Sequence, residues 1–543
     1  MPGTEKQGKL MNCRLLGAIL GLVLIAGCSS SSDDAGESGL RVEQLFAGGM
    51  IYDGSGNAPF LADLGISDGK IAFIGDAEDA GVQADEAFDV AGHWVAPGFI
   101  DAHSHAALDA DYGRDATPYL YQGITSVVLG VDGMGANLAQ RMDLWQANGI
   151  GVNGLLFIGH GSVREQVMGR DDREPSADEM QAMHALVREG MEEGAFGLST
   201  GLFYVPGTYA STEEVIELAK TAADYAGAIY DTHDRDLGAV YQGVGYEASV
   251  QEAIRIGEES GLRVIFSHFN LQGAHNYGRA HVGAKLVNDA RERGVEVWAA
   301  HHPYTATQSN LRSYTIPDWA SAGGSEEMIA RFDDPDQSAE IREVTNAMLG
   351  VRGGADKIMF VDPRPELNGK TLADISRERE LAPADAVQQI LREDDAGVMN
   401  LELYDHENTK VLAQEHWMMT CTDGVTPRPD VPITHPRTFG AFAQKMRLFV
   451  FEDPVITPEF AIRSFSGLAA DFYRLPDRGY LREGYVADVV VLDPERYRDK
   501  ATFENPRLYT EGVAHVLVNG TFAVRDGKTT GAMAGVAISR PGG

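Results

Sequence analysis

Eight short apolar segments alternate with helical patterns through the middle of the chain, and this alternation restricts the fold more than any other feature. Fully apolar runs between helices are typical of parallel strands that are buried on both faces. Eight such units predict an α/β fold, a closed (β/α)8 TIM-like barrel with its active site at the carboxyl ends of the strands. The helix expected over residues 212–225 begins with Ser211 and Glu214, which predict a capping box. The expected strands are WVAPGFIDAH, GITSVVLG, VNGLLFIG, GAFGLST, AGAIYDTH, GLRVIFSH, GVEVWAAHH and HWMMTCTDG.

Both ends of the chain carry a different pattern, in which apolar and polar residues alternate over short runs. The alternation covers residues 40–93 and returns after Gly484, where Asn519-Gly520 and Asp526-Gly527 are strong signals for tight hairpins. We therefore expect one small β-sandwich domain built from both chain ends.

The stretch between the last two expected barrel strands is too long for a simple loop. Residues 303–410 are therefore expected to form an insertion with its own helices, placed as a lid over the barrel mouth. The predicted organisation is a signal peptide at 1–27, a tether at 28–39, the β domain at 40–95 and 471–543, and the barrel at 96–470.

The first 28 residues have the pattern of an export signal. Lys6, Lys9 and Arg14 precede the apolar run LLGAILGLVLIAG, which is short for a permanent membrane span. The sequence Ile25-Ala26-Gly27-Cys28 resembles a bacterial lipobox, so Cys28 is expected to be lipidated after cleavage. This predicts a lipoprotein anchored in the outer membrane and facing the periplasm, with ordinary secretion as the alternative.

Charge and cysteine content exclude two further classes. The chain has 45 Lys and Arg against 80 Asp and Glu, a net charge of −35, which repels phosphate backbones and argues against nucleic acid as a partner. Membrane attachment is therefore expected only through Cys28. Cys13 leaves with the signal peptide, so Cys421 is the one free thiol, expected in the core, and a disulfide framework is excluded.

Histidines and an aspartate stand at the ends of four expected barrel strands. His103 and His105 end the first strand, and a spacing of two points both imidazoles to the same side. His233, His268 and Asp423 end the fifth, sixth and eighth strands. Singly, each histidine could be a structural residue, but together at one face of the barrel they predict a metal site. Imidazole and carboxylate suit zinc, and three or four such ligands leave a position open for water.

Several longer strings carry a resemblance to a known family. The run VAPGFIDAHSH with the strand-end ligands resembles the amidohydrolase superfamily, and the strings EEGAFGLSTGLFYVPGTYASTEEVIELAK, THDRD, PYTATQS and ITHPRTFGAF resemble its N-acyl-D-amino-acid deacylase (D-aminoacylase) branch. The resemblance implies hydrolysis of the N-acyl amide bond of amino acids, expected to be of D configuration, by metal-activated water. It implies one or two zinc ions, with other divalent metals as alternatives, and Asp423 as a metal ligand and the general base.

The chain departs from that branch at the position that bridges the metals. The branch has a cysteine after the second strand, whereas VVLGVDGMG places Asp132 there, and no lysine stands on the fourth strand to replace it. Asp132 is therefore the expected bridging ligand. A carboxylate is harder than a thiolate, so manganese, iron or cobalt would be accepted more readily. The alternative is that Asp132 only caps a turn beside Gly133.

A second departure concerns the substrate. The family lysine that pairs with the α-carboxylate of the substrate corresponds to Asn270 here, so either Arg235 or Arg437 takes over or the substrate lacks a carboxylate at that place. Tyr204, in the family string GLxYxPG, is expected to polarise the scissile carbonyl. Packing on the barrel rim remains the alternative for Tyr204, and a surface salt bridge for Arg235. Ordinary loop polarity remains the alternative for Tyr304 and Ser309, and loop packing for His435 and Arg437. The expected substrate-binding residues are Tyr204, Arg235, Asn270, Tyr304, Ser309, His435 and Arg437.

Two other functions remain open at this point. A metallo-dipeptidase or isopeptidase would use the same barrel chemistry on a short peptide instead of an N-acyl amino acid. A non-catalytic binding lipoprotein would explain the two departures but has no physical need for an open metal site. A hydantoinase-type activity is less favoured without a lysine on the fourth strand.

Overall fold

The computed structural model describes residues 40–542. The expected signal peptide, the tether and Cys28 lie outside these residues. Within them, no helix is both long and apolar enough to cross a membrane.

The eight expected segments form the wall of a barrel of parallel strands. Consecutive strands pair in parallel, and the third segment is divided at Phe157 into β8 and β9. The last strand closes on the first, because Ala102 N donates to Thr420 O (3.3 Å) and Asp423 N donates to His103 O (3.0 Å). The strands are β6 (Phe99–Asp101), β7 (Ile124–Leu129), β8 (Asn153–Leu156), β9 (Ile158–Gly159), β10 (Gly197–Gly201), β11 (Ile229–His233), β12 (Arg263–His268), β13 (Val297–His301) and β17 (Met418–Thr420).

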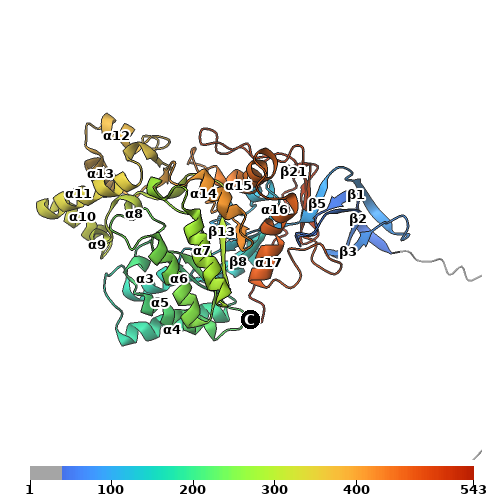
Figure 1. Cartoon of the computed structure of the whole chain (residues 1–543), viewed down its shortest axis with the longest axis horizontal. Helices are drawn as coiled ribbons and strands as arrows, with labels where there is room; N and C mark the ends of the chain where they lie inside the picture. Colours follow the sequence, from blue (N-terminus) through green and yellow to red (C-terminus); the bar gives the residue numbers. More distant parts are fainter. Residues whose placement is uncertain (1–39, 543) are drawn as a thin grey trace, which may run out of the picture. The chain divides into compact units, whose positions relative to one another are not determined.

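Helices follow the strands and cover the barrel (Figure 1). In α5 the Ser211 hydroxyl accepts the Glu214 N–H as predicted, but the expected capping box is incomplete because the Glu214 carboxylate turns inward to His160 (2.9 Å) and Arg164. The helices are α1 (Thr117–Leu120), α2 (Leu138–Asn148), α3 (His160–Met168), α4 (Ala177–Glu192), α5 (Thr212–Ala223), α6 (Tyr246–Ser260), α7 (Ala280–Glu292), α14 (His406–Ala413), α15 (Arg437–Met446), α16 (Pro458–Phe465) and α17 (Gly467–Tyr473).

Strands from both chain ends share one nine-stranded sheet, which confirms the small β domain. Asn519-Gly520 and Asp526-Gly527 form the two predicted turns, with positive φ at all four residues. The sheet surrounds its own apolar core, which includes Phe46, Leu64 and Val489. Its strands are β1 (Arg41–Ile51), β2 (Phe60–Ser67), β3 (Lys70–Gly75), β4 (Gln83–Asp89), β5 (Trp94–Pro97), β18 (Val489–Leu492), β19 (Val513–Val518), β20 (Thr521–Arg525) and β21 (Lys528–Thr529).

The last short strand, β22 (Ala537–Ile538), leaves this sheet and pairs in parallel with β8. Arg540 then inserts its buried guanidinium among backbone carbonyls, including Ala195 O at 3.1 Å. The chain end thus covers the edge of β8, which sequence patterning did not predict.

The insertion has helices, a three-stranded sheet and a separate apolar core. Its helices gather on one side of the barrel, away from β1–β3 (Figure 1). The expected bounds of the insertion also include the first residues of helix α14, which instead packs on barrel helix α7. The elements are β14 (Thr307–Asn310), α8 (Leu311–Thr315), α9 (Asp318–Ser321), α10 (Ser325–Asp333), α11 (Pro335–Val351), β15 (Ile358–Phe360), α12 (Leu372–Glu378), α13 (Pro383–Glu393) and β16 (Gly397–Asn400).

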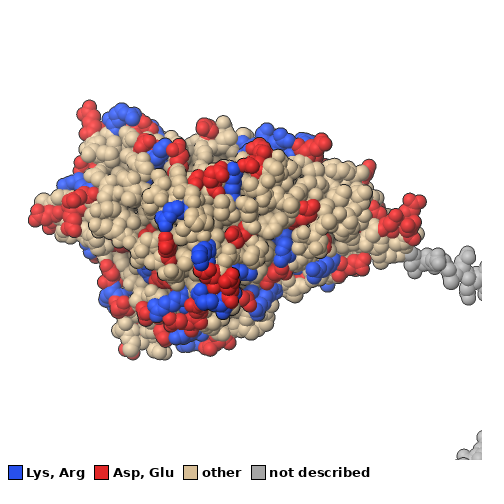
Figure 2. Space-filling view, in the orientation of Figure 1, with Lys and Arg blue, Asp and Glu red and all other residues tan. Residues whose placement is uncertain are grey.

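Acidic and basic side chains are intermixed on the face shown in Figure 2. Exposed arginines pair with neighbouring acids, as Arg255 does with Glu213 (2.9 Å) and Glu259 (2.6 Å). Such exposed pairs contribute little stability each. The excess of acidic residues therefore acts mainly on solubility.

Candidate metal centre and substrate cavity

Six polar side chains meet at the carboxyl ends of the barrel strands. His103 and His105 follow β6, His233 and His268 end β11 and β12, and two aspartates lie in the turns after β7 and β17. Both aspartates, Asp132 and Asp423, have positive φ values of 55° and 47°. This conformation is uncommon outside glycine, and it persists where the surrounding structure enforces it.

Asp132 lies among imidazoles from three strands. Its Oδ2 is 3.3 Å from His105 Nε2, and its Oδ1 is within 3.9 Å of nitrogens on the three other histidines. The distances from Oδ1 are 3.5 Å to His103 Nε2, 3.8 Å to His233 Nδ1 and 3.9 Å to His268 Nε2. The carboxylate therefore faces the histidines with both oxygens instead of capping the turn beside Gly133.

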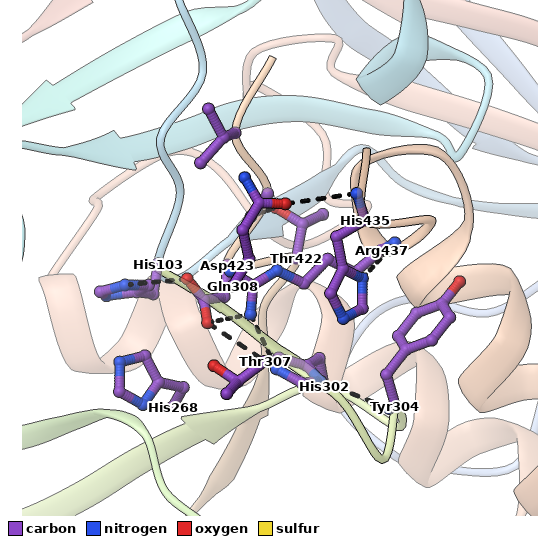
Figure 3. Close-up of polar contacts among 12 residues, drawn as sticks. His103, His268, His302, Tyr304, Thr307, Gln308, Thr422, Asp423, His435 and Arg437 are labelled. Carbon is purple, nitrogen blue, oxygen red and sulfur yellow. Dashed lines mark hydrogen bonds and ion pairs between the residues drawn. The ribbon is translucent and has the colours of Figure 1, made fainter. Parts of the chain in front are cut away.

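Asp423 occupies the other side of His103 and His105. Its Oδ1 lies 3.7 Å from His103 Nε2 and 3.5 Å from His105 Nε2. Its Oδ2 accepts a hydrogen bond from Arg437 Nη1, which also donates to His302 Nε2 at 3.2 Å (Figure 3). The two oxygens of Asp423 thus have different partners.

The donor set fits a divalent metal ion. Two ligands bound at about 2.1 Å to one tetrahedral ion lie roughly 3.4 Å apart, close to the separations seen here and longer than good hydrogen bonds. Both ring nitrogens of His103, Oδ1 of Asp132 and one nitrogen each of His233 and His268 are buried without a hydrogen-bond partner among the described residues. Buried polar atoms are rarely left unpaired, so those that face the cluster, namely His103 Nε2, Asp132 Oδ1 and His233 Nδ1, point to a missing ligand. Two triads have donor atoms within 4.8 Å of one another, namely His103–Asp132–His268 and His103–His105–Asp423.

The electrostatics of the cluster favour cation binding. Burial lowers the pKa of His103 and of His233 to about 3, so both rings are neutral and keep a lone pair. Burial alone would raise the pKa of Asp132, but the neighbouring His103, His105 and His233 rings hold that pKa below its usual range. Both carboxylates are therefore ionised, because Arg437 similarly outweighs burial and keeps the pKa of Asp423 well below its usual range.

Hydrogen bonds beneath the cluster fix the two aspartate turns. Gly133 N donates to Ser199 Oγ (3.1 Å), which donates to Asp231 Oδ2 (2.6 Å). On the other side, Asp101 accepts from Thr422 N (2.8 Å) and Thr422 Oγ1 (2.5 Å). Such supporting contacts orient metal ligands and tune their affinity.

A cavity of about 480 Å³ opens over this cluster. Three of the expected substrate-binding residues line it, namely Tyr204, Ser309 and Arg437. The Tyr204 ring centroid is 4.7 Å from that of His233. Burial raises the pKa of Tyr204 well above its usual value, so the phenol stays protonated and can donate a hydrogen bond.

Arg235 does not line the cavity. Its guanidinium binds Glu252 through Nε (2.9 Å) and Nη2 (2.8 Å), and also donates to the carbonyls of Thr208 and Ala210. Its position two residues after His233 predicted a contact with the substrate. Instead, the guanidinium pairs with the carboxylate of Glu252 in α6. Arg235 is therefore part of an internal salt bridge.

Asn270, Tyr304 and His435 are also absent from the cavity wall, and each is buried. Asn270 Oδ1 accepts the N–H of Leu271, and Tyr304 Oη donates to Pro436 O at 3.4 Å. His435 donates to Ala306 O (3.0 Å) and accepts the N–H of Arg437 (3.1 Å). His435 thus supports Arg437 without reaching the substrate space, and Cys421 is buried in the core as expected.

The cavity also has residues that sequence reasoning missed. Glu165 and Arg170 come from α3 and the turn after it, and Arg312 comes from α8 of the insertion. No motif marks these positions, because each side chain reaches the cavity only through the tertiary packing of its element. His302, left without a role, lies 3.7 Å from Asp423 Oδ2.

Comparisons with known proteins bear on this site. The sequence profile of the amidohydrolase family matches residues 86–524. The D-aminoacylase of Alcaligenes xylosoxydans xylosoxydans is 32% identical over 91% of this chain and 97% of its own length, and the N-acyl-D-aspartate deacylase of the same organism is 32% identical over 94% and 97%. The structure of the N-acyl-D-glutamate deacylase of Bordetella bronchiseptica, complexed with zinc and a phosphonate inhibitor, matches with a TM-score of 0.77 at 29% identity, over 92% of this chain and 100% of that one.

Proposed function

Because the chain belongs to the amidohydrolase family, we propose that it hydrolyses the amide bond of N-acyl-D-amino acids to a carboxylate and a free amino acid. One observation carries this proposal: four imidazoles and two carboxylates converge, with unpaired buried donor atoms, under a cavity at the barrel mouth. The similar deacylases extend over nearly the whole chain, so they share the barrel and the region of the site. The non-catalytic alternative has no support among these relatives.

The six side chains of the cluster would hold one or two divalent ions, and zinc is the ion present in the related N-acyl-D-glutamate deacylase. A bound ion supplies Lewis acidity, which makes hydroxide available from water at neutral pH and polarises a carbonyl group. Asp132 faces the imidazoles of β6, β11 and β12, so it would be shared where two ions bind.

The residues of this chain contribute positioning and proton transfer. Asp423, ionised and buried, takes the proton of the attacking water on its carboxylate and returns it to the leaving nitrogen. Arg437 fixes the orientation of that carboxylate through Oδ2. Tyr204 donates its phenol proton in a hydrogen bond to the carbonyl oxygen of the substrate, where negative charge develops.

The test is turnover of N-acetyl-D-amino acids by the metal-supplemented protein, followed by release of the free amino acid. L enantiomers and dipeptides run in parallel separate the deacylase from the dipeptidase alternative. We expect hydrolysis of the D substrates and its loss in Asp423→Asn, with Asp111→Asn, a change of an exposed carboxylate, as the control. Turnover of dipeptides alone would reject the proposal.

We also propose export and membrane anchoring through a lipidated Cys28. The support is the charged and apolar pattern of residues 1–27 before Ile25-Ala26-Gly27-Cys28. Metabolic labelling with a radioactive fatty acid should mark the wild-type protein and not Cys28→Ser. Equal labelling of both would reject lipidation at Cys28.

A further inference from the structure

We propose that Arg312 binds a carboxylate group of the substrate, an inference that rests on the proposed function. The position of the family lysine holds Asn270, which is buried outside the cavity. Arg235 is bound to Glu252. A carboxylate-bearing substrate therefore needs another cation, and the residues that line the cavity supply the candidates.

Three arginines line the cavity, and two of them donate side-chain hydrogen bonds to a carboxylate. Arg437 is buried and donates to Asp423, a group of the metal cluster. Arg170 donates through Nε to Glu165 Oε1 at 2.8 Å, and Glu165 also lines the cavity. Withdrawing Arg437 would leave a buried carboxylate without its partner, which costs free energy. Arg170 has one edge of its guanidinium occupied by Glu165.

Arg312 is held differently. Asp395 Oδ1 accepts the backbone N–H of Arg312 at 3.2 Å, whereas Asp395 Oδ2 lies 3.6 Å from the side-chain Nε, beyond good hydrogen-bond distance. Its two terminal nitrogens make no hydrogen bond to any residue between 40 and 542, and the side chain is 18% exposed. Asp395 thus anchors the start of α8 and leaves the fork of the guanidinium free.

The wall that carries Arg312 is continuous with the metal cluster. Ser309 in β14 is three residues before Arg312, and both residues line the same cavity as Tyr204. Tyr204 in turn packs on His233. A substrate whose carbonyl lies at Tyr204 therefore extends along Ser309 towards Arg312.

Carboxylate is the group that this arrangement recognises. A free guanidinium fork matches the two oxygens of a carboxylate, and partial burial strengthens the contact relative to water. The carboxylate could be the α-carboxylate of any N-acyl amino acid or the side-chain carboxylate of an acidic one. Both have the same chemistry, and a panel of substrates distinguishes them.

The experiment compares wild type, Arg312→Met and Arg312→Lys on three compounds: N-acetyl-D-leucine, N-acetyl-D-leucinamide and N-acetyl-D-glutamate. In Arg312→Met we expect KM to rise by roughly 10- to 100-fold for a carboxylate that Arg312 binds, with kcat changed by less than about threefold. The amide, which has no carboxylate, should be unaffected, and lysine should restore part of the affinity. A rise for both acids identifies the α-carboxylate, whereas a rise for N-acetyl-D-glutamate alone identifies the side chain.

Two variants serve as controls. Arg377→Met changes an exposed arginine on α12 of the same insertion and should behave as wild type. Arg170→Met should have the smaller effect, because Glu165 already holds that guanidinium. Equal changes for charged and neutral substrates, no change in Arg312→Met, or a larger effect of Arg170→Met would overturn the assignment.

Failure of the proposed function would be visible separately, as absence of wild-type turnover on all three compounds. Calorimetric titration with N-acetyl-D-glutamate then still decides the role of Arg312. Binding by wild type that is weakened at least tenfold in Arg312→Met supports it. Equal binding, or none to wild type, refutes it.

Discussion

The Oδ2 atom of Asp132 lies 3.3 Å from Nε2 of His105, which also lies 3.5 Å from Oδ1 of Asp423. The other oxygen, Oδ1, faces His103, His233 and His268. Asp132 therefore contacts all four histidines of the cluster. Its replacement should therefore affect the metal content before anything else.

We expect Asp132→Ala to bind less metal per chain than wild type and to lose at least tenfold in metal affinity, because a ligand that contacts all four histidines is removed. Elemental analysis of dialysed protein measures the stoichiometry. Asp111→Ala, at an exposed carboxylate, is the control. An unchanged stoichiometry and turnover rate would remove Asp132 from the site.

Tyr204→Phe should lower kcat by roughly 100-fold with little change in metal content, because it removes a donor to the developing oxyanion. Tyr209→Phe is the matched control, since its hydroxyl donates to Asp318 O outside the cavity. Steady-state kinetics on the best D substrate gives the result. Equal kcat values for Tyr204→Phe and wild type would assign the residue to rim packing.

Ser199 supports Asp132 without reaching the cavity. In Ser199→Ala the buried N–H of Gly133 loses its acceptor, which costs about 1–3 kcal/mol and loosens the turn that carries Asp132. Metal affinity should fall roughly 10-fold, and Ser199→Thr, which keeps a hydroxyl, should recover part of it. Melting curves with and without metal separate the two effects: a purely structural role would lower both melting temperatures equally.

The sequence predicted the residues whose direction is set by regular structure. His103 and His105 share a strand end, and strands that pair in parallel must bring His233 and His268 to the same edge. Arg235 and Asn270 stand equally close to strand ends in the sequence, yet their side chains leave the cavity. Their orientation depends on partners from other elements, such as Glu252 in α6, which no local pattern encodes.

The same limit explains Glu214 and Arg312. Glu214 follows Ser211 at the spacing of a capping box, but its carboxylate binds the buried Arg164 of α3 instead of the helix N-terminus. Arg312 belongs to the cavity because β14 and α8 of the insertion form part of its wall. Local spacing therefore predicts the metal ligands well and the substrate-facing side chains only in part.

Lys445 gives a prediction about stability instead of catalysis. It is fully buried on α15, and its Nζ donates to Thr420 Oγ1 (2.7 Å) and Ser464 Oγ (3.2 Å). Burial lowers the pKa of Lys445 to about 7, against an opposing contribution from Cys421. Burial also lowers the pKa of the neighbouring His301. The ammonium form is therefore costly in the folded state.

The sign of the pH dependence follows from this. Between about pH 7 and 10.4 the unfolded chain keeps a proton on Lys445 that the folded protein has lost, so this residue makes stability rise with pH in that window. Below pH 7 the free-energy cost of burying the charged ammonium group is fully present. Lys445→Met removes it, while Thr420 and Ser464 can still hydrogen-bond to each other at 3.1 Å.

We expect Lys445→Met to be more stable than wild type by about 4–5 kcal/mol at pH 6, and this advantage to shrink towards zero above pH 10. Melting temperatures of the two proteins at pH 6, 8 and 10, at fixed metal concentration, measure the difference. Lys285→Met, at an exposed lysine of α7, should show no such convergence. A constant difference at all three pH values would mean that Lys445 keeps its proton in the folded protein, and that its two hydroxyl partners compensate for burial.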